Sequence, residues 1–89
     1  MSAETPEIRL RRLRMRSWRR GMREMDLLLG PFADAALDDF PADALDRFEA
    51  FLAENDQDLY LWICRGRDSP ARHADVISRI CAFHRLVAP

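Results

Sequence analysis

Apolar residues recur every three or four positions along most of the chain, which is the spacing of one face of an α-helix. The clearest stripe predicts a helix over residues 22–37 and consists of Met22, Met25, Leu29, Phe32 and Ala36. No segment alternates polar and apolar residues with a period of two, so the sequence predicts no strand. The pattern therefore favours an all-α fold.

Start signals place further helices on both sides of this stripe. Thr5 as the N-cap residue and Pro6 at the first helical position predict a helix over residues 6–18. The apolar pattern restarts at Pro41 and predicts a third helix that ends near Asn55. The segments between the predicted helices are short, and short connections between helices are typical of a helical bundle.

Two shorter helices are predicted in the rest of the chain. The pair Asn55-Asp56 caps the segment QDLYLWICR as a fourth helix, which stops at Gly66. The pair Ser69-Pro70 starts a fifth helix that runs to about residue 86. Because 89 residues suffice for one core, we expect a single-domain, compact five-helix bundle over residues 1–89, with residues 1–5 flexible and 87–89 as a tail. The predicted core consists of Leu29, Phe32, Leu45, Phe48, Leu52, Leu59, Trp62, Ile77 and Ile80.

The stretch RRGMREMD, residues 19–26, contains a glycine that interrupts the helical pattern. Glycine in a helix interior costs about 1 kcal/mol relative to alanine, so its position needs a reason. Gly21 lies where one apolar stripe ends and the next begins, which predicts a corner between the first two helices. Glu24 is then placed to cap the second helix or to pair with Arg20, four residues earlier.

A second interruption, Gly30-Pro31, falls inside the predicted second helix. Proline lacks the backbone N–H and clashes with the preceding helical turn. We therefore expect a kink or a one-turn break at this point rather than a straight helix.

Charge is strongly segregated in a chain whose formal net charge is only −1. Residues 1–25 hold eight arginines and three acids, whereas residues 26–58 hold ten acids and one arginine. A cationic ridge on the first helix, which would attract phosphate backbones, consists of Arg9, Arg12, Arg16 and Arg20. The alternative function is therefore a small arginine-rich nucleic-acid-binding module, although the chain is net acidic and shows no helix-turn-helix pattern.

The sequence offers little for catalysis or for metal binding. Cys64 and Cys81 lie far apart without a CxxC motif, which favours reduced thiols over a metal site or a disulfide. His73 and His84 are too widely spaced to chelate one metal ion. No base accompanies an activated cysteine or serine, so we expect no catalytic residue. The lack of a secretory leader and of an apolar run near the roughly 18 residues of a membrane span favours a cytoplasmic protein.

Several of these segments occur together in one known family. The motif RGxxE is present as Arg20-Gly21-Met22-Arg23-Glu24, and DLxxW follows as Asp58-Leu59 with Trp62. With an apolar helix and an acidic helix between these motifs, the chain resembles the succinate dehydrogenase assembly factor, or flavinylation factor, family over roughly residues 10–86. RGxxE alone would occur by chance, so the resemblance depends on its combination with DLxxW and with the chain length.

The resemblance implies a small chaperone of bacteria or mitochondria, not an enzyme. Family members bind the flavoprotein subunit of succinate dehydrogenase, and in some bacteria that of fumarate reductase. They promote covalent attachment of FAD to a histidine of that subunit. By this resemblance we expect a monomeric protein of the bacterial cytoplasm that binds no FAD stably, since the FAD is attached to the client.

The resemblance also implies which residues contact the client flavoprotein. Arg20, Gly21 and Glu24 match the motif that faces the client near its flavin. A glycine lets a partner approach the backbone, while Arg20 and Glu24 would offer a donor fork and a carboxylate beside it. Neighbours included with these three are Arg19, Arg23 and Asp26.

Overall fold

The computed structural model describes residues 4–66 and 68–85 of the chain. Its α-helices are α1 (Pro6–Trp18), α2 (Arg23–Ala36), α3 (Ala42–Leu52), α4 (Asp56–Cys64) and α5 (Ala74–His84). Two short 3-10 turns, η1 (Leu37–Asp39) and η2 (Ala71–His73), follow α2 and precede α5. No strand occurs among the described residues, and the predicted all-α fold with five helices is confirmed.

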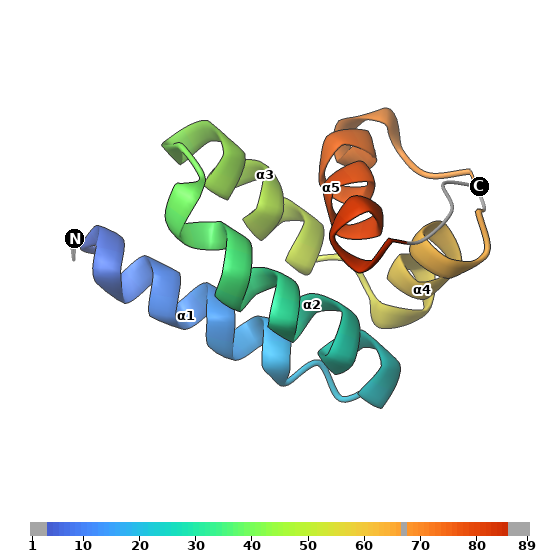
Figure 1. The fold of residues 1–89 in the computed structure, drawn as a ribbon, viewed down its shortest axis with the longest axis horizontal. Helices are drawn as coiled ribbons and strands as arrows, with labels where there is room; N and C mark the ends of the chain where they lie inside the picture. The colour runs from blue at the N-terminus through green and yellow to red at the C-terminus, as the bar shows by residue number, and fades with distance from the viewer. Residues whose placement is uncertain (1–3, 67, 86–89) are drawn as a thin grey trace.

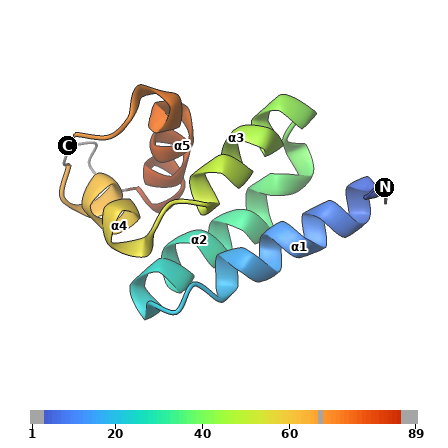
Figure 2. The same cartoon turned by 180° about the vertical axis from the view of Figure 1, so that it is seen from behind.

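The long helices α1 and α2 lie side by side and run in opposite directions (Figure 1). α2 also contacts α4 and α5, so it is the central element of the fold. α4 and α5 lie together at the end of the molecule that is remote from the N-terminus, as the reverse view also shows (Figure 2). None of the helices in the described part of the chain is long and apolar enough to cross a bilayer.

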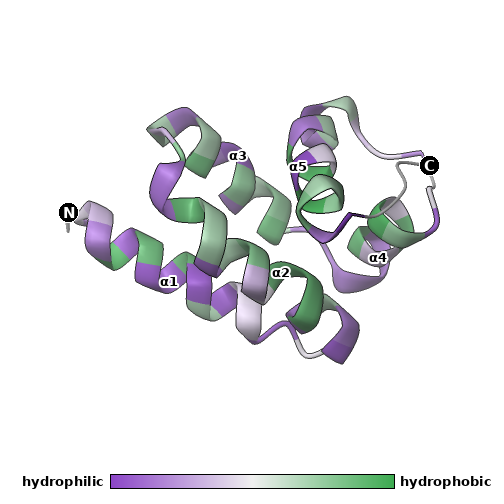
Figure 3. Cartoon of the chain, in the orientation of Figure 1, coloured by the Kyte–Doolittle hydropathy of each residue, from purple (hydrophilic) through white to green (hydrophobic). Residues whose placement is uncertain are grey.

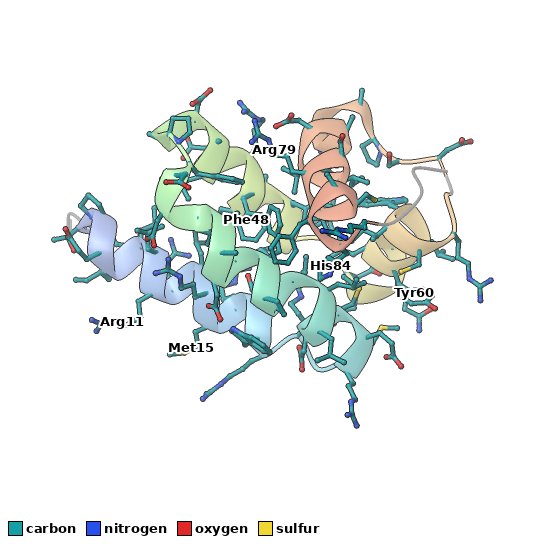
Figure 4. The ribbon with its side chains drawn as sticks, in the orientation of Figure 1. Arg11, Met15, Phe48, Tyr60, Arg79 and His84 are labelled. Atoms are coloured by element: carbon teal, nitrogen blue, oxygen red, sulfur yellow. The ribbon has the colours of Figure 1, made fainter. Side chains whose placement is uncertain are left out.

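The core lies where the apolar faces of the helices meet. Of the nine predicted core residues, eight are buried, and Trp62 is partly buried and packs against the others. The Phe32 ring packs against the rings of Phe40, Phe48 and Phe83, which join α2 to the residue after η1, to α3 and to α5. Phe48 accordingly lies in the middle of the molecule, between α2 and α3 (Figure 4).

Of the kink or one-turn break expected in the second helix, the break is wrong, because α2 continues through Pro31. Two contacts from other helices hold it at this point. The Trp18 ring of α1 lies directly against Gly30, and the His84 ring of α5 donates a hydrogen bond from Nε2 to the Leu28 carbonyl at 2.7 Å. His84 reaches from α5 toward α2 in Figure 4. Packing from both sides therefore outweighs the one backbone hydrogen bond that proline removes.

The predicted start of the fifth helix is also wrong. Ser69 and Pro70 precede the helix, and the chain first forms the 3-10 turn η2 before α5 begins at Ala74. This tight turn places His73 in the interior, where its ring packs against the rings of Phe51 and Trp62. The burial of His73 thus accounts for the delayed start.

The starts of α1 and α4 agree with the sequence signals. Thr5 caps α1 by accepting a hydrogen bond from the Ile8 N–H at 3.2 Å, and Asn55 caps α4 by accepting one from the Asp58 N–H at 2.9 Å. Glu4, within the segment expected to be flexible, makes an ion pair with an arginine of α1. Residues 1–3 and 87–89, and the expected helix end at residue 86, lie outside the described residues.

Candidate functional site

The segment between α1 and α2 is an exposed corner, as the sequence predicts. α1 ends at Trp18, and Gly21 has a φ of +91°, which residues with a side chain rarely adopt. A Cβ atom added to Gly21 would meet nothing within 4 Å. The glycine is therefore required by the turn of the backbone and not by a crowded neighbour, and its backbone faces open space. Hydrophilic residues surround this corner in Figure 3.

The Arg20 side chain points from the corner into the molecule, and only 10% of it is exposed. Its Nε donates to the Asp56 carboxylate at 2.7 Å. Its Nη1 and Nη2 donate to the backbone carbonyls of Leu52 and Glu54 at 2.6 and 2.8 Å. The expected pairing of Arg20 with Glu24 is therefore wrong, because the guanidinium binds the turn between α3 and α4. Carbonyls at a helix end lack intrahelical donors, and Arg20 supplies them at the end of α3.

Among the other predicted site residues, one is partly buried and the rest are exposed. Asp26 is half-buried, and its Oδ1 accepts the Arg20 backbone N–H at 2.6 Å, which fixes the corner from inside. α2 begins without a side-chain cap, so the predicted capping by Glu24 is also wrong. The residues of the corner that are exposed are Arg19, Gly21, Arg23 and Glu24.

Glu54 extends the hydrogen-bond network from the corner to the start of α5. Its carboxylate accepts from His73 Nε2 at 2.8 Å and from Arg72 Nη2 at 2.9 Å. These two bonds hold the pKa of Glu54 below its ordinary value, and the one from His73 has the larger effect. His73 Nδ1 is buried and has no hydrogen-bond partner among the described residues. One chain of contacts thus connects Arg20, through Glu54, to His73.

Sequence reasoning missed Glu54, Asp56 and His73 as supports of the corner. The Arg20–Asp56 pair spans 36 residues, and the His73–Glu54 pair spans 19. Helical periodicity reports only contacts within about one turn, so it contains no signal for either pair. The one available hint was that Asp56 falls in a predicted interhelical turn.

The cationic ridge predicted on the first helix is largely neutralised in the folded chain. Arg9 binds Asp46 and Glu49 of α3 at 2.6 and 3.1 Å, and Arg12 binds Glu49 at 2.8 Å. The Arg12 guanidinium, followed by that of Arg9, lowers the pKa of Glu49. Because Arg20 is also internally bound, three of the four ridge residues are already paired with protein groups. Nothing in this arrangement favours nucleic-acid binding.

The described residues contain no group of three or more histidine, cysteine or acidic side chains that could hold a metal ion. Cys64 and Cys81 are free thiols. Burial raises the pKa of the Cys81 thiol, which keeps it protonated and a poor nucleophile near neutral pH.

Comparison with known proteins connects these features to one family. The family described as the flavinator of succinate dehydrogenase, Sdh5, matches residues 11–84, which include the whole corner and its supports. A succinate dehydrogenase assembly factor 2 from mitochondria of Mycosarcoma maydis is 37% identical over 87 residues, 97% of this chain and 37% of that protein. No solved structure matches the chain.

Two further relatives differ in the share of their length that is matched. The FAD assembly factor SdhE of Photobacterium profundum is 37% identical over 67 residues, 74% of this chain and 76% of that protein. The mitochondrial succinate dehydrogenase assembly factor 2 of Schizosaccharomyces pombe is 37% identical over 71 residues, 80% of this chain and 51% of that protein. The chain thus spans about half or less of the fungal relatives and most of the bacterial one.

Proposed function

Because the chain belongs to the family of succinate dehydrogenase flavinators, we propose that it is an assembly factor that binds the flavoprotein subunit of succinate dehydrogenase and promotes covalent attachment of FAD to that subunit. The observation that carries this proposal is the family match over residues 11–84. The family consists of assembly factors and not of enzymes, in agreement with the expectation from the sequence.

The corner between α1 and α2 is the surface through which the chain binds its client. Its exposed members bring together two arginines, one carboxylate and a glycine whose backbone is accessible. This combination suits a partner surface that offers both acids and backbone donors. The exposed contact residues are Arg19, Gly21, Arg23 and Glu24.

Arg20 and Asp26 belong to the same site but act as positioning residues. Asp26 holds the backbone N–H of Arg20, and the Arg20 guanidinium holds the turn after α3. Removing either side chain would leave the exposed side chains chemically unchanged but would release the backbone that holds them in position. This role differs from the direct client contact that the sequence motif alone implies for Arg20.

The chain promotes flavinylation by holding its client and not by chemistry of its own. Binding that is stronger to the flavinylation-competent arrangement of the client than to other arrangements increases the population of that arrangement. The FAD is bound by the client, and this chain does not bind FAD stably. The same contacts extend to the flavoprotein subunit of fumarate reductase, and the free chain acts as a monomer in the bacterial cytoplasm.

In the direct test, single variants of this chain are expressed in a host whose own copy of the gene has been deleted. Glu24→Ala and Gly21→Arg are expected to abolish covalent flavin on the client, measured by in-gel flavin fluorescence. Asp39→Ala and Gly66→Arg are matched controls, since Asp39 is an exposed acid and Gly66 has a φ of +64°. Full flavinylation by Glu24→Ala would refute the site, and full flavinylation without the gene would refute the function.

A further inference from the structure

The side of α1 that faces away from the core carries three large apolar side chains. Ile8, Met15 and Trp18 are exposed by 52%, 50% and 40%. Their spacing of seven and three residues places them along one side of the helix, with Arg11 between them. Arg11 and Met15 extend outward from the same side of α1 in Figure 4. This stripe is opposite to the face that buries Leu13.

Trp18 is held rigidly in this stripe and extends it onto α2. Its ring lies so close to Gly30 that an added Cβ atom would overlap the ring, and its Nε1 donates to Asp34 at 3.0 Å. Leu27 is 53% exposed and lies one turn before Gly30 on the same side of α2. We call the resulting surface the α1 outer face; it consists of Ile8, Arg11, Met15, Trp18 and Leu27.

The α1 outer face is continuous with the corner at both of its edges. Trp18 directly precedes Arg19 in the chain. Leu27 lies three and four residues after Glu24 and Arg23, which is one helical turn along the same side of α2. A partner seated on the corner would therefore reach the apolar stripe without crossing a buried segment.

The charges around this face indicate the chemistry of its partner. In the part of the chain that the structure describes, seven arginines make ion pairs with carboxylates. Among the described residues, the arginines without such a pair are Arg11, Arg16, Arg19, Arg23, Arg65 and Arg85. Four of these six lie between residues 11 and 23, on α1 and the corner. Forked guanidinium groups without an internal acid favour a partner that supplies carboxylates.

We propose that the α1 outer face is a second contact surface for the flavoprotein client, which meets it with an apolar patch bordered by acidic residues. This inference rests on the proposed function. A phosphate backbone offers no apolar counterpart to Met15 and Leu27. An anionic bilayer is disfavoured because the Trp18 indole is tied to Asp34 and lies flat on α2, so it is not free to insert. An apolar centre with a charged border is instead the composition of a protein interface.

The test measures the affinity of the purified chain for the purified flavoprotein subunit by isothermal titration calorimetry. The variants Met15→Glu and Arg11→Glu are each expected to weaken binding by about tenfold or more. Leu61→Glu and Arg65→Glu replace an exposed leucine and an unpaired arginine of the α4 region and serve as matched controls, with an expected change below about twofold. Circular dichroism of each variant establishes that its fold is retained.

The outcomes separate this inference from the proposed function. If the unsubstituted chain does not bind the flavoprotein, both are overturned. If it binds and the two α1 variants bind equally well, the inference alone is overturned. It is also overturned if these variants bind the client normally but lose binding to phosphatidylglycerol vesicles, because the face would then be a membrane contact. Selective weakening by Met15→Glu and Arg11→Glu, with normal controls, supports it.

Discussion

The Arg20 guanidinium lies 2.7 Å from the Asp56 carboxylate, although 36 residues separate the two in sequence. This pair joins the exposed corner between α1 and α2 to the turn between α3 and α4. Both side chains are largely buried, at 10% and 19% exposure. The arginine of the RGxxE motif is therefore an internal support of the surface on which that motif lies.

Removal of the Arg20 side chain is expected to destabilise the fold itself. Asp56 and two backbone carbonyls would lose their donor in a largely buried place, so Arg20→Ala should lower the free energy of unfolding by about 3 kcal/mol. Arg19→Ala, next to it but exposed, should change this free energy by less than about 0.5 kcal/mol. Urea denaturation followed by circular dichroism measures both values.

Comparison of Arg20→Ala with Arg19→Ala and with Asp56→Ala distinguishes a positioning role of Arg20 from direct contact with the client. At a temperature where both variants are folded, Arg19→Ala should weaken client binding with no change in stability. Asp56→Ala should reproduce the stability loss of Arg20→Ala although Asp56 lies outside the motif. Equal stability of Arg20→Ala and the unsubstituted chain would contradict the supporting role of Arg20.

The contact between Trp18 and Gly30 leads to a second prediction. Gly30→Ala adds a Cβ atom that overlaps the indole, so the ring must leave its place on α2. The loss of this packing outweighs the gain in helix propensity, and we expect stability to fall by about 1 to 3 kcal/mol. In a Trp62→Phe background, the fluorescence of Trp18 should shift to longer wavelength.

Ala35→Gly is the control for this prediction. Ala35 is an exposed residue of the same helix. Its replacement by glycine should cost about 1 kcal/mol through helix propensity and leave the Trp18 emission unchanged. A normal emission spectrum of Gly30→Ala would show that the ring does not rest on Gly30.

Acid should weaken the contact between α1 and α3. Arg12 and Arg9 hold the pKa of Glu49 below its ordinary value of 4.5. A carboxyl group with a lowered folded-state pKa contributes stability above its unfolded-state pKa, and this contribution is lost as the pH falls through the folded-state value. Stability should therefore decrease below about pH 4.5, and Glu49→Gln should reduce this dependence.

The measurement for this prediction is the urea midpoint at several pH values between about 6 and 3. Asp39→Asn is the control, because Asp39 is exposed and makes no ion pair among the described residues. Its pH dependence should match that of the unsubstituted chain. If the urea midpoint of Glu49→Gln changed with pH as much as that of the unsubstituted chain, the contacts of Glu49 with Arg9 and Arg12 would contribute nothing to stability.

The sequence predicted what depends on neighbouring residues. Apolar periodicity located the five helices and nearly all the core, and Thr5 and Asn55 cap the helices they were expected to cap. The corner at Gly21 was also predicted, since a stripe ends before it and another begins after it. Each of these features is determined within one or two helical turns.

The features that the sequence did not predict depend on packing between distant segments. α2 passes through Pro31 because side chains of α1 and α5 hold it there, and α5 starts late because His73 is buried by rings of α3 and α4. The direction of Arg20 likewise depends on where the end of α3 lies. No local pattern in the sequence distinguishes an arginine that faces a partner from one that faces the interior.

The chain of contacts from Arg20 through Glu54 to His73 has a consequence for the strength of association with a partner. Because these side chains already hold the corner in one conformation, a partner does not have to immobilise a loop when it binds. Most of the conformational entropy that such ordering would cost has been lost during folding. A small chain with a limited contact area can then retain a larger part of its interaction energy as affinity.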